Sequence, residues 1–125
     1  MPIVFINSLP PSDSSVIGRM SAEVRDLGAG ALNTSRGNIW VIFQPIQPGN
    51  YLHGENLGSS PQQNLYPVVV IIKAQAGRSS ADRGNFVKAV TNSIGRNLSI
   101  PANNVWVHYQ EMNPKDVWFE GSWAG

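Results

Sequence analysis

Four near-continuous apolar runs, rich in Val and Ile, divide the chain into strand-forming segments. They cover residues 2–6, 38–45, 67–72 and 104–111. A strand with one wet face alternates apolar and polar side chains, whereas runs of this kind are typical of parallel strands covered on both faces. We therefore expect a sheet that has little contact with water on either side.

Apolar residues recur with helical spacing between the first two runs and again between the last two. The two sets are Val16, Ile17, Met20, Val24, Leu27 and Ala31, and Phe86, Val87, Val90, Ile94 and Leu98. Residues 12–14 and 79–80 supply N-cap candidates, and Asp82 follows where a helix dipole favours an acid. The expected helix ends are Gly28, Gly30 and Gly37 in the first half, and Asn97, Ser99 and Pro101 in the second.

The two halves of the chain match each other at an almost constant offset. Residues 38–45 match residues 104–111 at an offset of about 66, and residues 2–4 match residues 67–69 at about 65. Matches at nearly one offset indicate a tandem duplication. We predict a single domain, 1–125, made of two βαβ repeats at about 1–60 and 66–125, with a joining loop over 48–64.

Each repeat has the order strand, helix, strand, and this order predicts the fold. Right-handed βαβ crossovers place both helices on one face of a four-stranded mixed sheet, an α/β (α+β) architecture. Alternate residues such as Trp40, Trp106 and His108 would then project from the opposite face. Because large aromatic side chains would be left in water there, we expect the chain to form a homotrimer through this face.

Charge and composition exclude several classes of function. Charged residues make up 14% of the chain, against about a quarter in typical domains. The formal net charge is +1 with no run of Lys or Arg, so we expect no nucleic-acid and no membrane partner. Without cysteine, and with two histidines far apart, we expect no metal and no cofactor. No signal-peptide pattern is present, and the expected location is cytoplasmic.

Pro2, directly behind Met1, is the first candidate catalytic residue. Methionine aminopeptidases remove Met1 when a residue this small follows, which exposes a secondary amine at the start of a strand. The ordinary pKa of a terminal amine is about 8, and a positive neighbour or an apolar pocket lowers that pKa toward the range useful for a general base. Proline is also common at strand starts for structural reasons, so Pro2 alone does not decide the function.

Several motifs together resemble the tautomerase superfamily. They are Pro2, the Gly-Arg-Ser stretch at 77–79, the strand end at 107–112 and the tail at 118–121. In that family the 4-oxalocrotonate tautomerases are single βαβ units, and longer members are two fused units that assemble as trimers. The resemblance implies the tautomerase fold, also called MIF-like, and is strongest to fused members of the cis-3-chloroacrylic acid dehalogenase (cis-CaaD) type.

The resemblance also implies roles for Pro2 and Arg78. In the family the terminal proline nitrogen moves a proton, and an arginine in the Gly-Arg-Ser turn holds a substrate carboxylate. The chemistry agrees, because removing a proton beside a 2-oxo group creates an enolate whose charge needs a cation. Arg78 lies just ahead of a predicted helix N-terminus, where its planar fork and the helix dipole both favour an anion.

The chain departs from the dehalogenase pattern at two positions that matter for binding. Gln75 stands where these enzymes carry a second arginine, and their first-helix histidine has no counterpart within residues 26–29. In the simpler tautomerases a second arginine stands at the position of Trp106. A single arginine implies a weaker grip on carboxylates and disfavours hydrolytic dehalogenation.

The remaining candidate site residues lie near the C-terminus. His108 stands where the dehalogenases place a water-activating tyrosine, and it is either catalytic or an interface histidine; Tyr109, beside it, is a candidate substrate contact. The family's glutamate corresponds to Glu120 or to Asp116, depending on how the tail aligns. Trp118 either lines the pocket and lowers its dielectric or contacts another subunit.

Two interpretations follow. The first is a tautomerase-like general acid/base enzyme, in which free Pro2 acts on a small 2-oxo or unsaturated carboxylic acid held by Arg78. The reaction would be keto–enol tautomerisation, with hydratase, dehalogenase or decarboxylase chemistry as related alternatives. The second is a catalytically inactive trimeric module that keeps Met1, so that the Pro2 nitrogen is a tertiary amide with no usable lone pair. The mass of the intact protein distinguishes the two.

Overall fold

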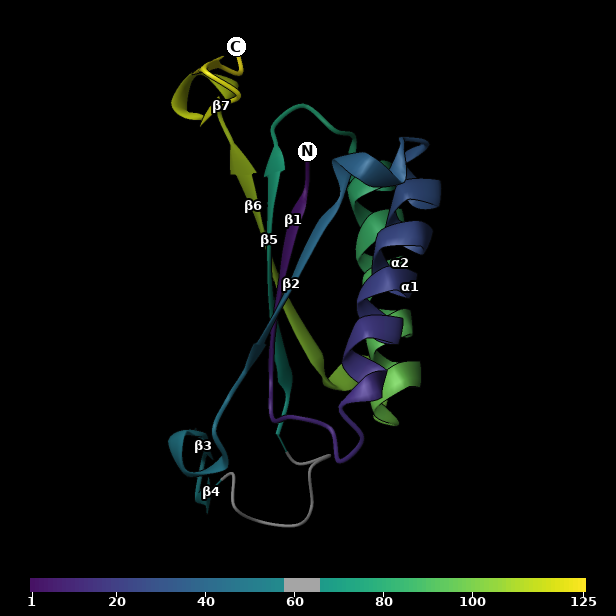
Figure 1. Cartoon of the computed structure of the whole chain (residues 1–125), viewed down its shortest axis with the longest axis vertical. Coiled ribbons are helices and arrows are strands. Elements are labelled where there is room, and N and C mark those ends of the chain that lie inside the picture. The colour runs from purple at the N-terminus through teal and green to yellow at the C-terminus, as the bar shows by residue number, and fades with distance from the viewer. Residues whose placement is uncertain (58–65) are drawn as a thin grey trace.

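The computed structural model describes residues 1–57 and 66–125, and its centre is a four-stranded mixed sheet (Figure 1). The strands are β1 (Ile3–Ser8), β2 (Trp40–Pro45), β5 (Val68–Gln75) and β6 (Val105–Met112), in the order β2-β1-β5-β6. β1 is parallel to β2 and β5 is parallel to β6, while β1 and β5 are antiparallel. This arrangement confirms the predicted mixed sheet.

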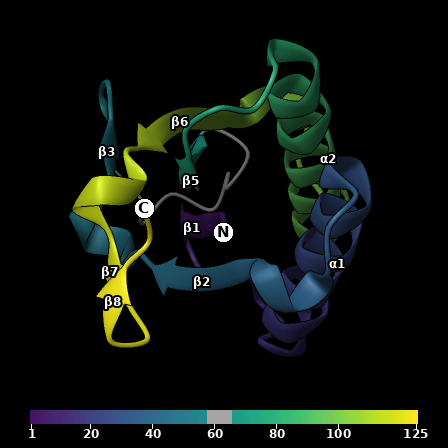
Figure 2. The same ribbon diagram turned by 90° about the horizontal axis from the view of Figure 1, so that it is seen from above.

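Both long helices cover the same face of the sheet. Figure 2, which looks along the molecule from above, shows α1 (Ser15–Leu32) and α2 (Ser80–Leu98) on one side and the two small hairpins on the other. The core lies between the helices and the sheet. Its fully buried side chains include Val4, Ile6, Met20, Val24, Val70, Ile72, Phe86, Val90 and Ile94.

The first helix ends later than its glycines predict. The expectation that Gly28 or Gly30 ends it is wrong, because α1 continues to Leu32 and is capped by Asn33 with φ 51°. Gly28 has a packing role instead, since an added Cβ there would lie 2.7 Å from Cε1 of Phe86 on α2. The glycine lets the two helices approach closely.

The second helix begins and ends as its sequence predicts. The Ser79 hydroxyl accepts a hydrogen bond from the Asp82 N–H at 3.1 Å, so Ser79 is the N-cap. Ser99, with φ 56°, is the C-cap, and its N–H donates to the Gly95 carbonyl. This cap fixes where α2 starts, and therefore where the preceding Gly-Arg-Ser turn lies.

Each half of the chain ends in a short helical turn followed by a two-stranded hairpin. The first tail contains a 3-10 turn (Pro48–Asn50), β3 (Leu52–His53) and β4 (Asn56–Leu57). The second contains a 3-10 turn (Pro114–Asp116), β7 (Trp118–Phe119) and β8 (Ser122–Trp123), at the same offset of 118 − 52 = 66 residues. The segment 48–64, predicted as a joining loop, therefore contains a 3-10 turn and a hairpin over 48–57, and its remainder, from 58 on, lies outside the described residues.

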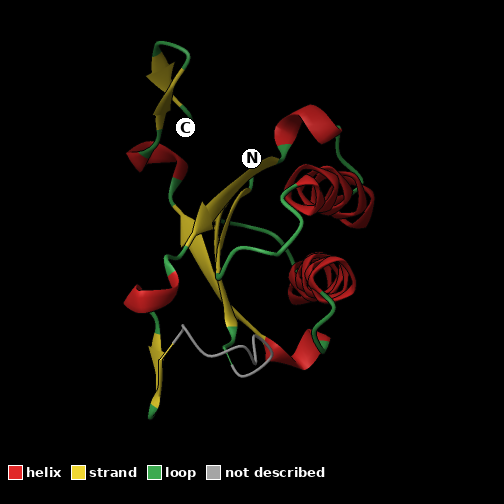
Figure 3. Ribbon diagram, turned by 60° about the horizontal axis from the view of Figure 1, so that its bottom comes forward, coloured by secondary structure: helices red, strands yellow, loops and turns green. Residues whose placement is uncertain are grey.

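The two hairpins lie at opposite ends of the sheet, as Figure 3 shows. The antiparallel contact between β1 and β5 explains this, because it relates the two halves by an approximate half-turn. The C-terminal hairpin therefore lies at the end of the sheet where β1 begins, beside the N-terminus (Figure 1).

The sheet face opposite the helices is apolar and uncovered in the single chain. Strand register places Ile3 between Trp40 and Lys73, and Phe5 between Ile42 and Ile71. Trp40 is 36% exposed, Ile42 41% and Trp106 54%, so aromatic and aliphatic side chains face water as expected. We call this surface the outer face.

Candidate active site

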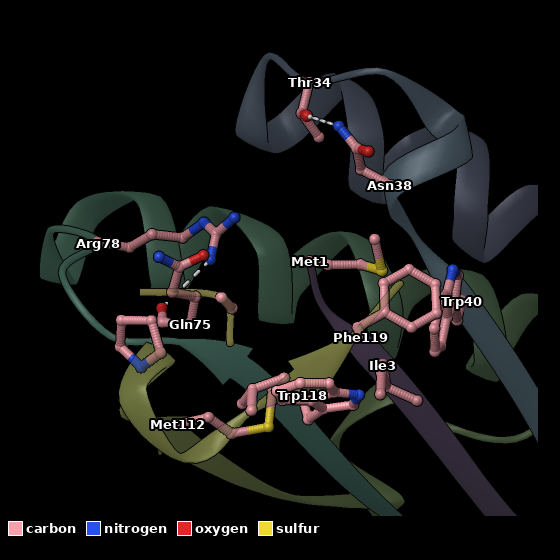
Figure 4. Close-up of a pocket in the computed structure, with 13 residues that line it drawn as sticks. Met1, Ile3, Thr34, Asn38, Trp40, Gln75, Arg78, Met112, Trp118 and Phe119 are labelled. Carbon is pink, nitrogen blue, oxygen red and sulfur yellow. Dashed lines mark hydrogen bonds between the residues drawn. The ribbon is translucent and has the colours of Figure 1, made fainter. Parts of the chain in front are cut away.

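A pocket of about 500 Å³ opens at the end of the sheet where β1 begins (Figure 4). Strand pairing brings the N-terminus to this pocket. The antiparallel pairing of β1 with β5 places Ile3 opposite Lys73, close to the end of β5. The N-terminus therefore meets the loop that leads into α2. The lining residues are Met1, Ile3, Thr34, Asn38, Trp40, Gln75, Arg78, Met112, Pro114, Val117, Trp118, Phe119 and Ala124.

Arg78 is presented to the pocket by a tight turn between β5 and α2. Gly77 has φ 112°, a conformation that favours glycine, and Ser79 caps the helix that follows. The Arg78 side chain is half-buried, and its Nη1 donates to the Gln75 carbonyl at 3.3 Å. Among the ion pairs of the described residues none involves Arg78, so most of its donors remain for a ligand.

Arg78 contributes to a lowered pKa of the terminal amine. Burial, and secondly the positive charge of Arg78, lower the pKa of the Met1 ammonium below its ordinary value of 8.0. Both causes penalise the protonated form, so a larger fraction of the amine is a free base near neutral pH. The pocket therefore holds a guanidinium beside a chain terminus whose ammonium has a lowered pKa.

Pro2 itself lies just behind the pocket lining. Its side chain is fully buried, and its carbonyl accepts a hydrogen bond from the Trp40 N–H at 3.0 Å, which anchors the start of β1 to β2. With Met1 attached, the Met1 side chain lines the pocket in place of Pro2. Removal of Met1 would make the Pro2 nitrogen the chain terminus on this well-anchored strand.

The C-terminal hairpin supplies an aromatic wall. Trp40 and Phe119 meet edge to face with ring centroids 5.1 Å apart, and Trp118 meets Trp123 in the same way at 5.2 Å. The hairpin turns through Glu120 at φ 54° and a glycine after it. Phe119 and Trp118 thus come from the C-terminal hairpin, and Trp40 is the first residue of β2, an edge strand of the sheet.

Three of the predicted site residues meet in this pocket and others do not. Arg78, Gln75 and Trp118 all line it. His108 projects from the outer face, with its ring 6.1 Å from the Trp106 ring and its Nδ1 3.4 Å from the Gln110 amide. Within one chain the structure therefore separates His108 from the N-terminus.

Tyr109, Glu120 and Asp116 also lie outside the pocket lining. Tyr109 packs on the helix side of the sheet, where the Arg83 guanidinium lies 5.0 Å from its ring centroid. Glu120 is exposed at the hairpin tip, and Asp116 is exposed on the 3-10 turn before it. Their proposed roles remain predictions.

Sequence reasoning missed a polar pair in the pocket lining. Asn38 Nδ2 donates to Thr34 Oγ1 at 3.0 Å, and both residues come from the connection between α1 and β2. That connection shows no periodicity, and only the packing of the first half against the N-terminus places it here.

Two searches of the described residues returned nothing. No group of three or more His, Cys, Asp or Glu side chains in 1–57 and 66–125 could hold a metal ion. Over the same residues, neither long helix has the length and apolarity needed to cross a membrane.

Comparison with known structures identifies the architecture, although no family model and no curated protein sequence matches the chain. A fused 4-OT that forms an asymmetric trimer matches with a TM-score of 0.86 and 14% identity, over 98% of this chain and 95% of that one. A protein inactivated by 2-oxo-3-pentynoate matches with a TM-score of 0.85 and 14% identity, over 98% and 94%. A member of the cis-3-chloroacrylic acid dehalogenase family matches at 0.79 and 16%, over 98% and 83%.

These matches cover nearly the whole chain at low sequence identity, so they establish the fold. The fold and the resemblance expected from the motifs at 77–79 and 107–112 agree with them. The chain has the fold of these structures, the tautomerase fold.

Proposed function

We propose that the protein is a tautomerase-like general acid/base enzyme whose base is the free Pro2 nitrogen and whose substrate is a small 2-oxo or unsaturated carboxylic acid held by Arg78. One observation carries the proposal: the chain terminus shares a pocket with Arg78, and burial and this arginine together lower the pKa of the terminal amine. The fold shared with fused 4-OT and cis-CaaD family structures supports it.

The chemistry is a proton transfer beside a carbonyl. The substrate carboxylate binds the Arg78 fork, which holds the C–H next to the 2-oxo group near the amine. The amine takes the proton from carbon and becomes an ammonium, and the electron pair moves onto the carbonyl oxygen. Water then supplies a proton to that oxygen, which gives the enol, and the ammonium releases its proton to water. In the reverse direction, the ammonium returns a proton to the carbon. Gln75, on the same side as Arg78, offers an amide donor to the enolate oxygen.

Pro2→Ala tests the base. Protein that begins at residue 2 should accelerate enolisation of phenylpyruvate, and the substitution should slow it by at least about tenfold, which corresponds to about 1.4 kcal/mol. Alanine still provides a terminal amine, but a primary and more flexible one, so the loss is incomplete. The measurement is kcat/KM by ultraviolet absorbance, with intact mass verifying that both proteins lack Met1. Equal rates would remove Pro2 from the mechanism.

We also propose that the chain forms a homotrimer through the outer face. The apolar rows around Phe5 and Ile42 are uncovered in one chain, and the matched fused 4-OT is a trimer. Three such sheets would enclose a central barrel and remove this surface from water. Assembly of this kind would also bring His108 of one subunit near the neighbouring chains.

Light scattering at micromolar concentration tests the assembly, with three times the chain mass expected. Ile42→Glu, which puts a charge on the outer face, should shift the protein to smaller species. Lys88→Glu is the matched control, because Lys88 is exposed on α2 and away from this face. A stable monomer of the unaltered chain would contradict the proposal.

A second function, an inactive trimeric module, is favoured by one observation. In the structure the Met1 side chain lines the pocket, and Gln75 stands where a second cation would strengthen carboxylate binding. If Met1 is retained in the cell, the Pro2 nitrogen stays a tertiary amide and cannot act as a base. The intact mass of the protein isolated from its natural host decides between the two functions.

A further inference from the structure

The outer face carries one lysine on a surface that is otherwise apolar or neutral. Strand register places Lys73 on this face, between Ile3 of β1 and Gln110 of β6. Of the side chains that alternate onto the face from the four described strands, Lys73 is the only Lys or Arg, and none is Asp or Glu. The positive charge of Lys73 therefore has no counter-charge on its own face.

Lys73 also has no carboxylate partner elsewhere in the part of the chain that the structure describes. None of the ion pairs there includes it, and its Nζ lies over the Phe5 ring, 5.9 Å from the centroid. The nearest carboxylate along β6, Glu111, alternates onto the helix side and pairs with Arg83. A cation–π contact at an exposed site is weak, and it does not neutralise the charge.

Assembly through the outer face would take this ammonium out of bulk water. Lys73 is exposed in the single chain and lies on β5, one of the two central strands of the sheet. In the proposed trimer the three outer faces line the enclosed interior, so three copies of Lys73 would point toward the axis. Like charges repel strongly where water is scarce, and a buried charge is costly unless it is paired. An anion on the axis would supply the pairing that the chain lacks.

Gln110 adds a neutral donor beside the lysine. The two residues are register partners on parallel strands and share the outer face. Gln110 Nε2 lies 3.4 Å from His108 Nδ1, and since an amide nitrogen carries two N–H groups, one remains for a ligand. A threefold axis would repeat this pair of donors three times. That arrangement matches a tetrahedral oxyanion, in which three oxygens are related by a threefold axis.

We propose that the trimer binds one tetrahedral oxyanion, of the inorganic phosphate or sulfate class, on its axis through Lys73 and Gln110 of all three chains, and that this anion stabilises the assembly. One chain offers a single ammonium and a single amide, so the site is incomplete without the partner copies. The inference rests on the proposed trimer. It does not rest on the proposed reaction, because neither residue lines the pocket that holds Arg78.

Calorimetric titration with inorganic phosphate tests the site. Arg78→Ala is the background for every titration, so that the pocket cannot add a second anion site. We expect one phosphate for every three chains, and no binding after Lys73→Met, which keeps a long side chain and removes the charge. Lys88→Met, which removes an exposed lysine of α2, is the matched control and should bind phosphate as before. One phosphate per chain, or unaltered binding by Lys73→Met, would overturn the proposal.

Thermal unfolding gives a second measurement. A ligand that binds only the assembled protein raises the unfolding midpoint, so replacing chloride by phosphate at constant ionic strength should raise it by at least about 3 °C. Lys73→Met should have a higher midpoint than the unaltered protein in phosphate-free buffer, because three unpaired charges are gone, and phosphate should not raise it further. Gln110→Leu should reduce the phosphate effect without abolishing it. If Lys73→Met aggregates, Lys73→Gln replaces it with the same expected loss of the phosphate effect.

Light scattering separates this proposal from the trimer on which it rests. A chain that stays monomeric with and without phosphate would reject the trimer and the axial site together. A trimer whose midpoint does not respond to phosphate, or responds equally after Lys73→Met, would reject the axial site alone. Turnover of 2-oxo acids, which depends on Pro2 and Arg78, is measured independently of both.

Discussion

Protein that keeps Met1 is expected to turn over 2-oxo acids at least about 100-fold more slowly than protein that begins at Pro2. With Met1 attached, the Pro2 nitrogen is an amide, and the only terminal amine lies one residue away, about 3.8 Å along the chain. A misplacement of even about 1 Å costs a reaction of this kind about two orders of magnitude. The Met1 side chain also lines the pocket, so it would compete with a substrate for that space.

The comparison needs two preparations of one sequence. A cleavable tag that leaves Pro2 first gives the free secondary amine, and a host deficient in methionine removal gives the Met1 form, with intact mass verifying each. Kinetics with phenylpyruvate give the ratio. The inactivator of the matched structure, 2-oxo-3-pentynoate, is a second probe, because its conjugated alkyne adds to a free amine. We expect its adduct at Pro2 in the first preparation.

Equal turnover by the two preparations would be the contrary result. It would mean that the Met1 amine, whose pKa is lowered by burial and by Arg78, is itself the base or that no terminal amine takes part. The position of the pentynoate adduct on Met1 or elsewhere would separate these outcomes.

Arg78→Ala is expected to lower kcat/KM by at least about 100-fold while the oligomeric state of the protein stays unchanged. An arginine–carboxylate pair in a partly buried site is a charge-assisted contact with two parallel bonds, and truncating it costs a few kcal/mol. Arg78→Lys should recover only part of the loss, because an ammonium keeps the charge without the fork. Gln75→Arg should tighten the binding of small carboxylates by adding a second cation at the same end.

Arg78→Ala should also shift the pH dependence of the reaction. The amine works when unprotonated, so activity rises with pH through the pKa of the amine. Burial and the charge of Arg78 hold that pKa below 8.0 for the terminal amine in the structure, and we expect the same two causes to act on free Pro2. Removing the guanidinium removes the second cause, so the rising limb of the kcat/KM profile should shift to higher pH.

Arg83→Ala is the control for both effects. Arg83 lies five residues further along, on α2, where it pairs with Glu111 at 3.1 Å and does not line the pocket. Arg83→Ala should leave both kcat/KM and the pH profile of kcat/KM close to those of the unaltered protein. If Arg78→Ala matched Arg83→Ala in turnover and in inhibition by carboxylates, the pocket would not be the active site and the inactive module would be the better interpretation.

Local patterns were sufficient for most of the secondary structure. The near-continuous apolar runs became β1, β2, β5 and β6, and the two sets at helical spacing became α1 and α2. Apolar periodicity reports which side of an element is buried, and this is a property of neighbouring residues. The error at Gly28 has the opposite origin, because Phe86 of another helix makes that glycine necessary.

Strand alternation placed His108 on the sheet face opposite the helices, but it could not say which face holds the site. The structure puts Tyr109 under Arg83 on the helix side and His108 on the outer face. Which of them approaches a substrate depends on where the sheet ends meet other segments, and alternation along one strand contains no information about that.

The sequence by itself determined the four strands of the sheet, the two helices and the start of α2 at the Gly-Arg-Ser turn, because each of these depends on residues that are close together in the chain. Only the tertiary structure decided that the N-terminus, Arg78, Trp40 and Phe119 share one pocket. The antiparallel pairing of β1 with β5 places the N-terminus beside the end of β5. The C-terminal hairpin then contacts β2 at the same end of the sheet, through Phe119 and Trp40. Contacts between segments so far apart in sequence arise from chain topology, which no local pattern encodes.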